Sequence, residues 1–288
     1  DSLILLEWDK LREMMWHNNC TIAPYGFVNA VKKVALIKNK DLFTGYDQND
    51  IQEFLLFLID CFHEALSRPV NMTIHGSIEN DTDKLAIECY TMMKKMYDKE
   101  YSEVLDIFYG IHLSVVTKKD SDKIISMNPE PFSAINLSLP PMSNPTIYDC
   151  FDYYCKKESL INENQYEIKD GLKIDADKGI IFWSLPKILI LCIKRWKQSG
   201  NKIHSVVNTP MENVDFSRYV YGYNSNECVY DLYAVCNHMG GSMGGHYVAC
   251  VKNANGKWYE FNDTSVREIN DDNIISASTY CFFYRKKK

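Results

Sequence analysis

The first hundred residues carry apolar side chains at intervals of three and four, a spacing typical of amphipathic helices. This pattern predicts helices over residues 1–20, 27–37, 47–66 and 84–107, with the polar segment 67–83 predicted as a loop. The clearest helix is 47–66, in which one face collects the apolar residues Ile51, Phe54, Leu55, Leu58, Phe62 and Ala65. We expect Asp47 to cap this helix and Asp50 to lie in its first turn, where a negative charge is favoured.

From Phe108 onward the pattern predicts short strands. Residues 131–139 and 180–196 are predicted strands, and the run Ile188–Ile193 is apolar throughout, which is typical of a strand buried on both faces. Polar and charged residues over 117–130 predict a loop. Near the end of the chain, alternating positions predict antiparallel strands over 230–236, 247–251, 258–261 and 280–284. Helices followed by a sheet indicate an α+β fold.

Composition narrows the classes of partner. The 288 residues are 46% apolar and 24% charged, with a net charge of −6. A chain of this size can bury a large core, whereas a mildly acidic balance argues against nucleic acid as the main partner. No stretch of about 18 apolar residues is present, so the sequence predicts no membrane span. The ten cysteines are scattered, without a Cys-x-x-Cys pair. This indicates core thiols in a reducing intracellular compartment, the cytoplasm or the nucleus.

The candidate chemistry lies near the end of the chain. Residues 238–245 contain four glycines, and such a backbone can approach a ligand closely. His246 follows at once and Asn262 lies beyond an Asn255-Gly256 turn, so neighbouring strands can bring both side chains to one sheet edge. A histidine held by a carboxamide is the base half of a nucleophilic triad. We expect Asn262 to accept the Nδ1–H and to leave Nε2 to take a proton. The alternative is that His246 is an ordinary surface histidine.

Five segments extend this interpretation to the whole chain. They are Gln48–Leu55, Leu185–Trp196, Tyr233–Ala249, Trp258–Val266 and the closing strand Tyr280–Arg285. In their order and residues they resemble the ubiquitin-specific protease family of cysteine deubiquitinases. The resemblance implies a papain-like fold with a helical thumb, an antiparallel β palm and β fingers, in a single catalytic domain over 1–288. Its expected parts are the thumb over 1–107, mainly fingers over 108–180 and mainly palm over 181–288.

The resemblance also implies roles for individual residues. His246 matches the catalytic base of the family, Asn262 the third member of its triad, and Asp263 a neighbour that helps to position or stabilise the reacting centre. The basic C-terminal tail of ubiquitin is expected to contact five residues, which are Gln48, Asp50, Glu53, Gly245 and Tyr247. Carboxylates beside a channel suit a tail rich in arginine. The alternative is that Asp50 and Glu53 are only a helix cap and a solvated charge.

The chain departs from the family in its nucleophile. The segment that carries the attacking cysteine in the family has no match here, and we expect it upstream of Asp1. Cys20 resembles it only superficially, because no glycine precedes it and Pro24 follows where a helix should begin. A helix N-terminus is what lowers the pKa of a thiol.

The second departure concerns metal. Many family members bind zinc through two Cys-x-x-Cys pairs, and the equivalent segments 115–124 and 166–175 contain neither Cys nor His. Tetrahedral zinc needs four such ligands. We therefore expect no metal and no other cofactor.

Together these features predict a thiol-dependent deubiquitinase that hydrolyses the bond after the C-terminal glycine of ubiquitin. The expected partners are ubiquitin and ubiquitinated proteins, with no nucleic acid and no membrane, and the expected state is a monomer. Two alternatives stay open. One is a catalytically inactive ubiquitin-binding module of the same fold, and the other is a papain-like protease for a ubiquitin-like modifier.

Overall fold

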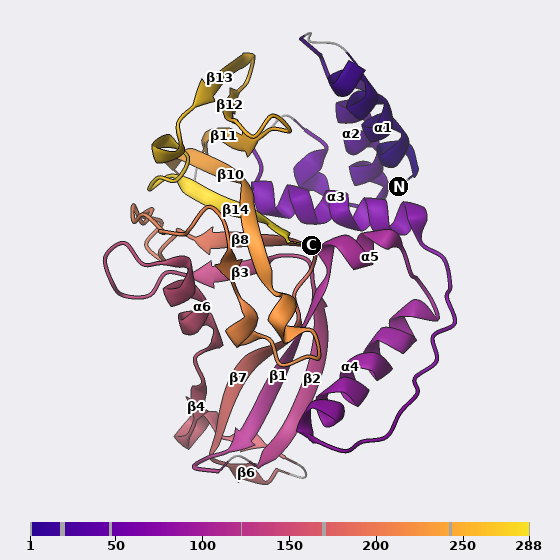
Figure 1. Cartoon of the computed structure of the whole chain (residues 1–288), viewed down its shortest axis with the longest axis vertical. Coiled ribbons are helices and arrows are strands. Elements are labelled where there is room, and N and C mark those ends of the chain that lie inside the picture. Colours follow the sequence, from indigo (N-terminus) through magenta and orange to yellow (C-terminus); the bar gives the residue numbers. More distant parts are fainter. Residues whose placement is uncertain are drawn as a thin grey trace.

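The computed structural model describes residues 2–17, 21–45, 48–121, 123–168, 171–241 and 244–287 (Figure 1). Three positions discussed above, Asp1, Cys20 and Asp47, therefore lie outside the described residues, as does part of the glycine-rich segment. Among the described residues, none of the helices combines the length and the hydrophobicity that crossing a membrane requires.

The N-terminal part of the chain is helical, as predicted. Its α-helices are α1 (Ser2–His17), α2 (Tyr25–Ile37), α3 (Ile51–Leu66), α4 (Asp81–Tyr97) and α5 (Glu103–Phe108), with a 3₁₀ turn at Asp41–Phe43. The single helix predicted over 84–107 is wrong, because it divides into α4 and α5. Between them Tyr101 pairs with Arg68 through an isolated β-bridge, and these extended residues cannot continue a helix.

Helix α3 begins at Ile51, four residues later than predicted, because Asp50 is its N-cap. The face predicted to be its core is also incomplete, since the most buried residues of α3 are Phe57, Ile59 and Cys61. The reason is that α3 lies between two layers. Phe57 and Cys61 pack with α1 and α2, while Ile59 packs toward the larger sheet (Figure 1).

The larger sheet holds the C-terminal part of the chain. Its strands run in the order β13-β12-β11-β10-β14-β8-β3, with β9 paired to β10, and every pair is antiparallel except β3 with β8. Their bounds are β3 (Ile135–Ser138), β8 (Ile188–Lys194), β9 (Val214–Asp215), β10 (Val229–Gly241), β11 (Gly244–Lys252), β12 (Trp258–Asn262), β13 (Ser265–Ile269) and β14 (Thr279–Lys286). The prediction that Ile188–Ile193 is buried on both faces is confirmed for its last five residues, because Leu189 to Ile193 are consecutive, point to alternate faces and are at most 2% exposed.

A smaller four-stranded sheet lies at the opposite end of the molecule (Figure 1). Its strands, in spatial order, are β2 (Ile124–Phe132), β1 (Gly110–Lys118), β7 (Ala176–Ser184) and β4 (Glu158–Leu160), and a short hairpin joins β5 (Tyr166–Glu167) to β6 (Lys173–Ile174). The loop predicted over 117–130 is wrong, since β2 fills half of it and the end of β1 fills its first two residues. β2 is an edge strand, and an edge tolerates the polar residues and prolines, Pro129 and Pro131, that hide a strand in the sequence.

The strand predicted over 180–196 is two strands in different sheets. β7 ends at Ser184 and β8 begins at Ile188, with Pro186 between them. Helix α6 (Ile147–Cys155) covers one face of the larger sheet, and α3 and α5 cover the other (Figure 1). Helices followed by sheets confirm the α+β class. The division of the chain at 107 and 180 stays a prediction.

Stability should depend on pH through His112 on β1. This side chain is 16% exposed and stacks on Phe132, and its Nδ1 has no hydrogen-bond partner in the part of the chain that the structure describes. Burial lowers its pKa from the ordinary value of 6.5, and Glu130 only partly opposes this. The fold therefore favours the neutral ring, so stability is complete above pH 6.5 and falls as the pH drops below it.

We expect the melting temperature, measured by calorimetry, to fall less between pH 7.5 and pH 5.5 in His112→Phe than in the wild-type protein. The matched control is His204→Gln, at an exposed position, which should keep the wild-type pH dependence. Equal losses in all three proteins would contradict the assignment.

Candidate active site

Three predicted site residues come together at one end of the larger sheet. His246 lies on β11, and Asn262 ends the neighbouring strand β12. The Nε2 atom of His246 is 2.7 Å from Oδ1 of Asn262 and 3.9 Å from Oδ2 of Asp263. The His246 side chain is 41% exposed, so a reactant can reach the ring.

The expected orientation of the ring is wrong. We predicted that Asn262 would accept the Nδ1–H, but the nitrogen that contacts Asn262 is Nε2. The β11–β12 ladder begins at Ala249, three positions after His246. The His246 side chain therefore extends beyond the end of the ladder, and Nε2, the ring nitrogen farther from the backbone, contacts Asn262. A carboxamide oxygen can only accept, so the neutral ring carries its proton on Nε2. The nitrogen left to take a proton is Nδ1.

Asp263 follows Asn262 in the turn between β12 and β13, with a φ of 51°. Asp and Asn tolerate this left-handed conformation better than most residues. The turn aims the carboxylate at the ring edge while leaving the side chain 79% exposed.

The start of β11 is tied to the start of α3. The backbone N–H of Gly245 donates to Oε1 of Gln48 at 2.5 Å, and the backbone N–H of Ile51 donates to the Tyr247 hydroxyl at 3.4 Å. Position 245 must be glycine, because a Cβ there would lie 2.3 Å from Nε2 of His238. These contacts flank His246 on both sides in the sequence. Burial also raises the pKa of Tyr247 to about 12, so its hydroxyl stays protonated at neutral pH.

Asp50 caps helix α3, which is the structural alternative given for it above. Its Oδ1 accepts hydrogen bonds from the backbone of Gln52 at 2.8 Å and of Glu53 at 3.2 Å, and thereby caps α3. Its Oδ2 accepts a hydrogen bond from the Tyr280 hydroxyl on β14 at 2.6 Å. Burial and this carboxylate raise the pKa of Tyr280. The Glu53 side chain, by contrast, is exposed.

Sequence analysis missed two contacts near this site, that of Tyr280 with Asp50 and that of Lys202 with His238, whose Nδ1 lies 3.0 Å from the Lys202 ammonium. Tyr280 was assigned only to the closing strand, and its partner Asp50 is 230 residues away, so no local pattern could pair them. Lys202 lies in a polar loop whose path the sequence does not reveal. His238 was noted only as part of the glycine-rich segment.

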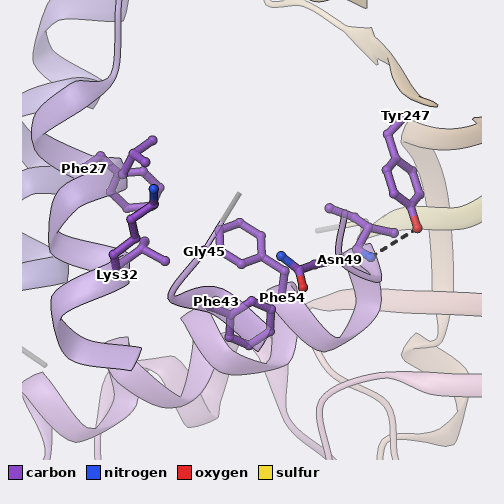
Figure 2. Close-up of a pocket in the computed structure, with 10 residues that line it drawn as sticks. Phe27, Lys32, Phe43, Gly45, Asn49, Phe54 and Tyr247 are labelled. Carbon is purple, nitrogen blue, oxygen red and sulfur yellow. Dashed lines mark hydrogen bonds between the residues drawn. The ribbon is translucent and has the colours of Figure 1, made fainter. Parts of the chain in front are cut away.

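A pocket of about 270 Å³ lies beside this site, between α2, the start of α3 and Tyr247 (Figure 2). Its lining is mostly apolar, and Figure 2 shows Phe27, Phe43 and Phe54 around it, with the Tyr247 hydroxyl bonded to the α3 backbone. Over the described ranges, no group of three or more His, Cys, Asp or Glu side chains is arranged to hold a metal ion.

Comparison with known proteins gives the family. The sequence profile of the ubiquitin carboxyl-terminal hydrolase family matches residues 1–284. The chain belongs to this family. The match covers four of the five segments that carried the resemblance in full and the closing strand as far as residue 284, and the resemblance to ubiquitin-specific proteases is therefore confirmed.

Three curated members of the family match along nearly the whole chain. The chain is 31% identical to ubiquitin carboxyl-terminal hydrolase Usp2 of Drosophila melanogaster over 99% of its length and 30% of that protein. It is 30% identical to human ubiquitin carboxyl-terminal hydrolase 2 over 98% of its length and 47% of that protein. It is 28% identical to probable ubiquitin carboxyl-terminal hydrolase R319 of Acanthamoeba polyphaga mimivirus, over 96% of its length and 68% of that protein. The chain thus spans less than half the length of the first two.

A solved structure supports the fold. The SAGA DUB module of Ubp8, Sgf11, Sus1 and Sgf73, bound to monoubiquitin, contains a chain that superposes with a TM-score of 0.72 at 21% identity. The superposition covers 99% of this chain and 59% of that one. It confirms the α+β architecture of this family, while the roles of individual site residues stay predictions.

The two bonds of the Asp50 carboxylate should be measurable as stability. Loss of the cap costs about 1 kcal/mol, and leaving the Tyr280 hydroxyl without an acceptor costs about 1–3 kcal/mol. We therefore expect Asp50→Ala to lower the free energy of unfolding by about 3 kcal/mol, measured by urea denaturation.

Tyr280→Phe is the matched variant, because it removes only the bond to the sheet and should cost about 1 kcal/mol. In the double variant the two losses should not add, since both single changes break the same bond. An Asp50→Ala loss no larger than that of Tyr280→Phe would show that the cap contributes nothing.

Proposed function

We propose that this chain is the main part of a thiol-dependent deubiquitinase catalytic domain. The observation that carries the proposal is the 2.7 Å contact between His246 and Asn262 at the accessible end of β11 and β12, in a chain of the ubiquitin carboxyl-terminal hydrolase family. A histidine held by a carboxamide, with one nitrogen left for proton exchange, is suited to activate a thiol. A module that only bound ubiquitin would not need such an oriented base.

In the proposed reaction, a cysteine from a segment upstream of Asp1 attacks the carbonyl carbon of ubiquitin's terminal glycine. Nδ1 of His246 takes the thiol proton, and the C–N bond to the lysine side chain breaks as His246 returns that proton to the leaving amine. Water then attacks the thioester, His246 accepts one of its protons, and the thiol and ubiquitin's free carboxylate are released. Asn262 holds the ring throughout, and Asp263 stabilises its charged form.

The tail of ubiquitin is proposed to lie across the junction of α3 and β11. Asp50 and Glu53 at the start of α3 supply negative charge for its basic residues. Gln48, Gly245 and Tyr247 form the neighbouring wall, whose backbone is fixed by the contacts that join the helix to the strand. Because one oxygen of Asp50 already accepts two backbone N–H groups, the exposed Glu53 is proposed to contribute more to tail binding.

A ubiquitin probe with a thiol-reactive C-terminus tests the proposal. We expect it to label covalently a polypeptide extended upstream of Asp1 and to leave the 288-residue chain unlabelled, as read by mass spectrometry. Binding of ubiquitin without labelling of the extended polypeptide would favour the inactive module. Labelling of the short chain at Cys20 would refute an upstream nucleophile, and preference for a probe built on a ubiquitin-like modifier would reassign the substrate.

Single substitutions in the extended polypeptide test the roles of the site residues. His246→Ala should lower kcat for a ubiquitin conjugate by about 10³-fold or more, while ubiquitin binding measured by calorimetry changes little. Asn262→Ala should cost less, about 10–100-fold, because the base remains but is no longer held. His204→Ala, at an exposed histidine, is the matched control and should keep wild-type kcat. Comparable losses in all three variants would remove His246 from the mechanism.

A further inference from the structure

A half-buried lysine contacts the segment that leads into β11. The Lys202 ammonium donates to the backbone carbonyl of His238 at 2.5 Å and lies 3.0 Å from Nδ1 of the same residue. It also lies 5.5 Å from the centre of the Trp196 ring, and an isolated antiparallel bridge pairs Trp196 with Lys202. Lys202, the Trp196 ring and the backbone carbonyl of His238 on β10 thus lie in contact with one another.

This contact fixes the state of the His238 ring. A protonated ammonium has three donors and no lone pair, so Nδ1 of His238 must act as the acceptor. The proton of the neutral ring is then on Nε2. Lys202 therefore selects both the tautomer and the orientation of a histidine that is only 8% exposed.

His238 in turn supports the start of β11. In the ladder between β10 and β11, His238 lies opposite Tyr247, and the next residue, Met239, lies opposite His246. The His238 and Tyr247 rings are 4.7 Å apart, and Nε2 lies where a side chain of residue 245 would be. A shift of the His238 ring therefore meets Gly245 and Tyr247, the two residues on either side of His246.

We infer that Lys202 and His238 form a clamp beneath the start of β11 that positions His246 for catalysis. This inference rests on the proposed function of His246 as the base. Lys202 and His238 are positioning residues in this account, since they act through Gly245 and Tyr247 and touch no reacting atom.

The charges around His238 make the clamp sensitive to acid. Burial lowers the pKa of His238, Lys202 lowers it further, and Asp50 partly opposes both. Burial and the nearby Arg195 also lower the pKa of Lys202. The other titratable groups that face the ring are the hydroxyls of Tyr247 and Tyr280. Protonation of His238 would place two cations 3.0 Å apart, so the clamp is closed at neutral pH and opens only in acid, as the pH falls through the lowered pKa of His238.

The first experiment measures the clamp without reference to activity. Histidine ¹⁵N spectra of the full protein should show His238 neutral at pH 7 with its proton on Nε2. In Lys202→Met the titration midpoint of His238 should move to higher pH, because the nearest cation is gone. A proton on Nδ1 in the wild-type protein, or an unchanged midpoint in the variant, overturns the clamp whether or not the protein is an active hydrolase.

The second experiment measures positioning in the extended polypeptide. Lys202→Met should lower kcat at pH 6 by about tenfold with KM changed less than twofold, and the acid limb of its kcat–pH profile should move to higher pH. The control is Lys252→Met, which lies on β11 of the same sheet and removes an ion pair with Glu212 at the surface. This variant should match wild type.

The outcomes of the second experiment separate the two proposals. A misfolded variant loses the same fraction of kcat at every pH, so a lower but unshifted profile counts against positioning. A profile that superposes on wild type overturns the clamp and leaves the deubiquitinase intact. Absence of hydrolysis by the wild-type polypeptide itself refutes the proposed function, and the spectra then still decide whether the clamp exists.

Discussion

The carboxylate of Asp50 joins the helical layer to the larger sheet. One oxygen caps α3 by accepting hydrogen bonds from two backbone N–H groups. The other oxygen accepts a hydrogen bond from the Tyr280 hydroxyl on β14. The first N–H groups of a helix have no partner within the helix. In α3, two of them donate to Asp50, whose side chain also accepts a hydrogen bond from the larger sheet. The position of α3 relative to the sheet, and of everything held by α3, depends on this residue.

The site follows from that junction. With α3 fixed, Gln48 and Ile51 reach the two residues around His246, and β11 is held from the helical side. From the other side it rests on His238, so closely that residue 245 has no room for a side chain. His246, the proposed base, is accessible near the start of β11, and its two neighbours in the strand are held by these contacts. Catalytic groups need this combination, because small displacements of a base cost rate.

The missed strands and shifted boundaries share a physical cause. β2 resembles a loop in the sequence because an edge strand has unpaired backbone groups along one edge, so it admits prolines, and because most of its side chains are not buried. Residues 180–196 resemble one strand because apolar content is continuous across Pro186, although the chain changes sheets at this point. The core face of α3 was misjudged because a helix between two layers buries residues outside a single stripe. In each case the prediction used a local sequence pattern, whereas the structure was decided by packing against residues distant in the sequence.

The sequence by itself determined the α+β class through its periodicity and the family resemblance through the residues of five segments. It also determined the pairing of His246 with Asn262, through glycine spacing and a short turn. Only the tertiary structure decided which ring nitrogen faces Asn262, since that depends on where the β11–β12 ladder begins. It also decided that Asp50 serves Tyr280 as well as α3, and that Lys202 lies against His238. These contacts join residues 36 to 230 positions apart, and their geometry exists only once the layers have packed.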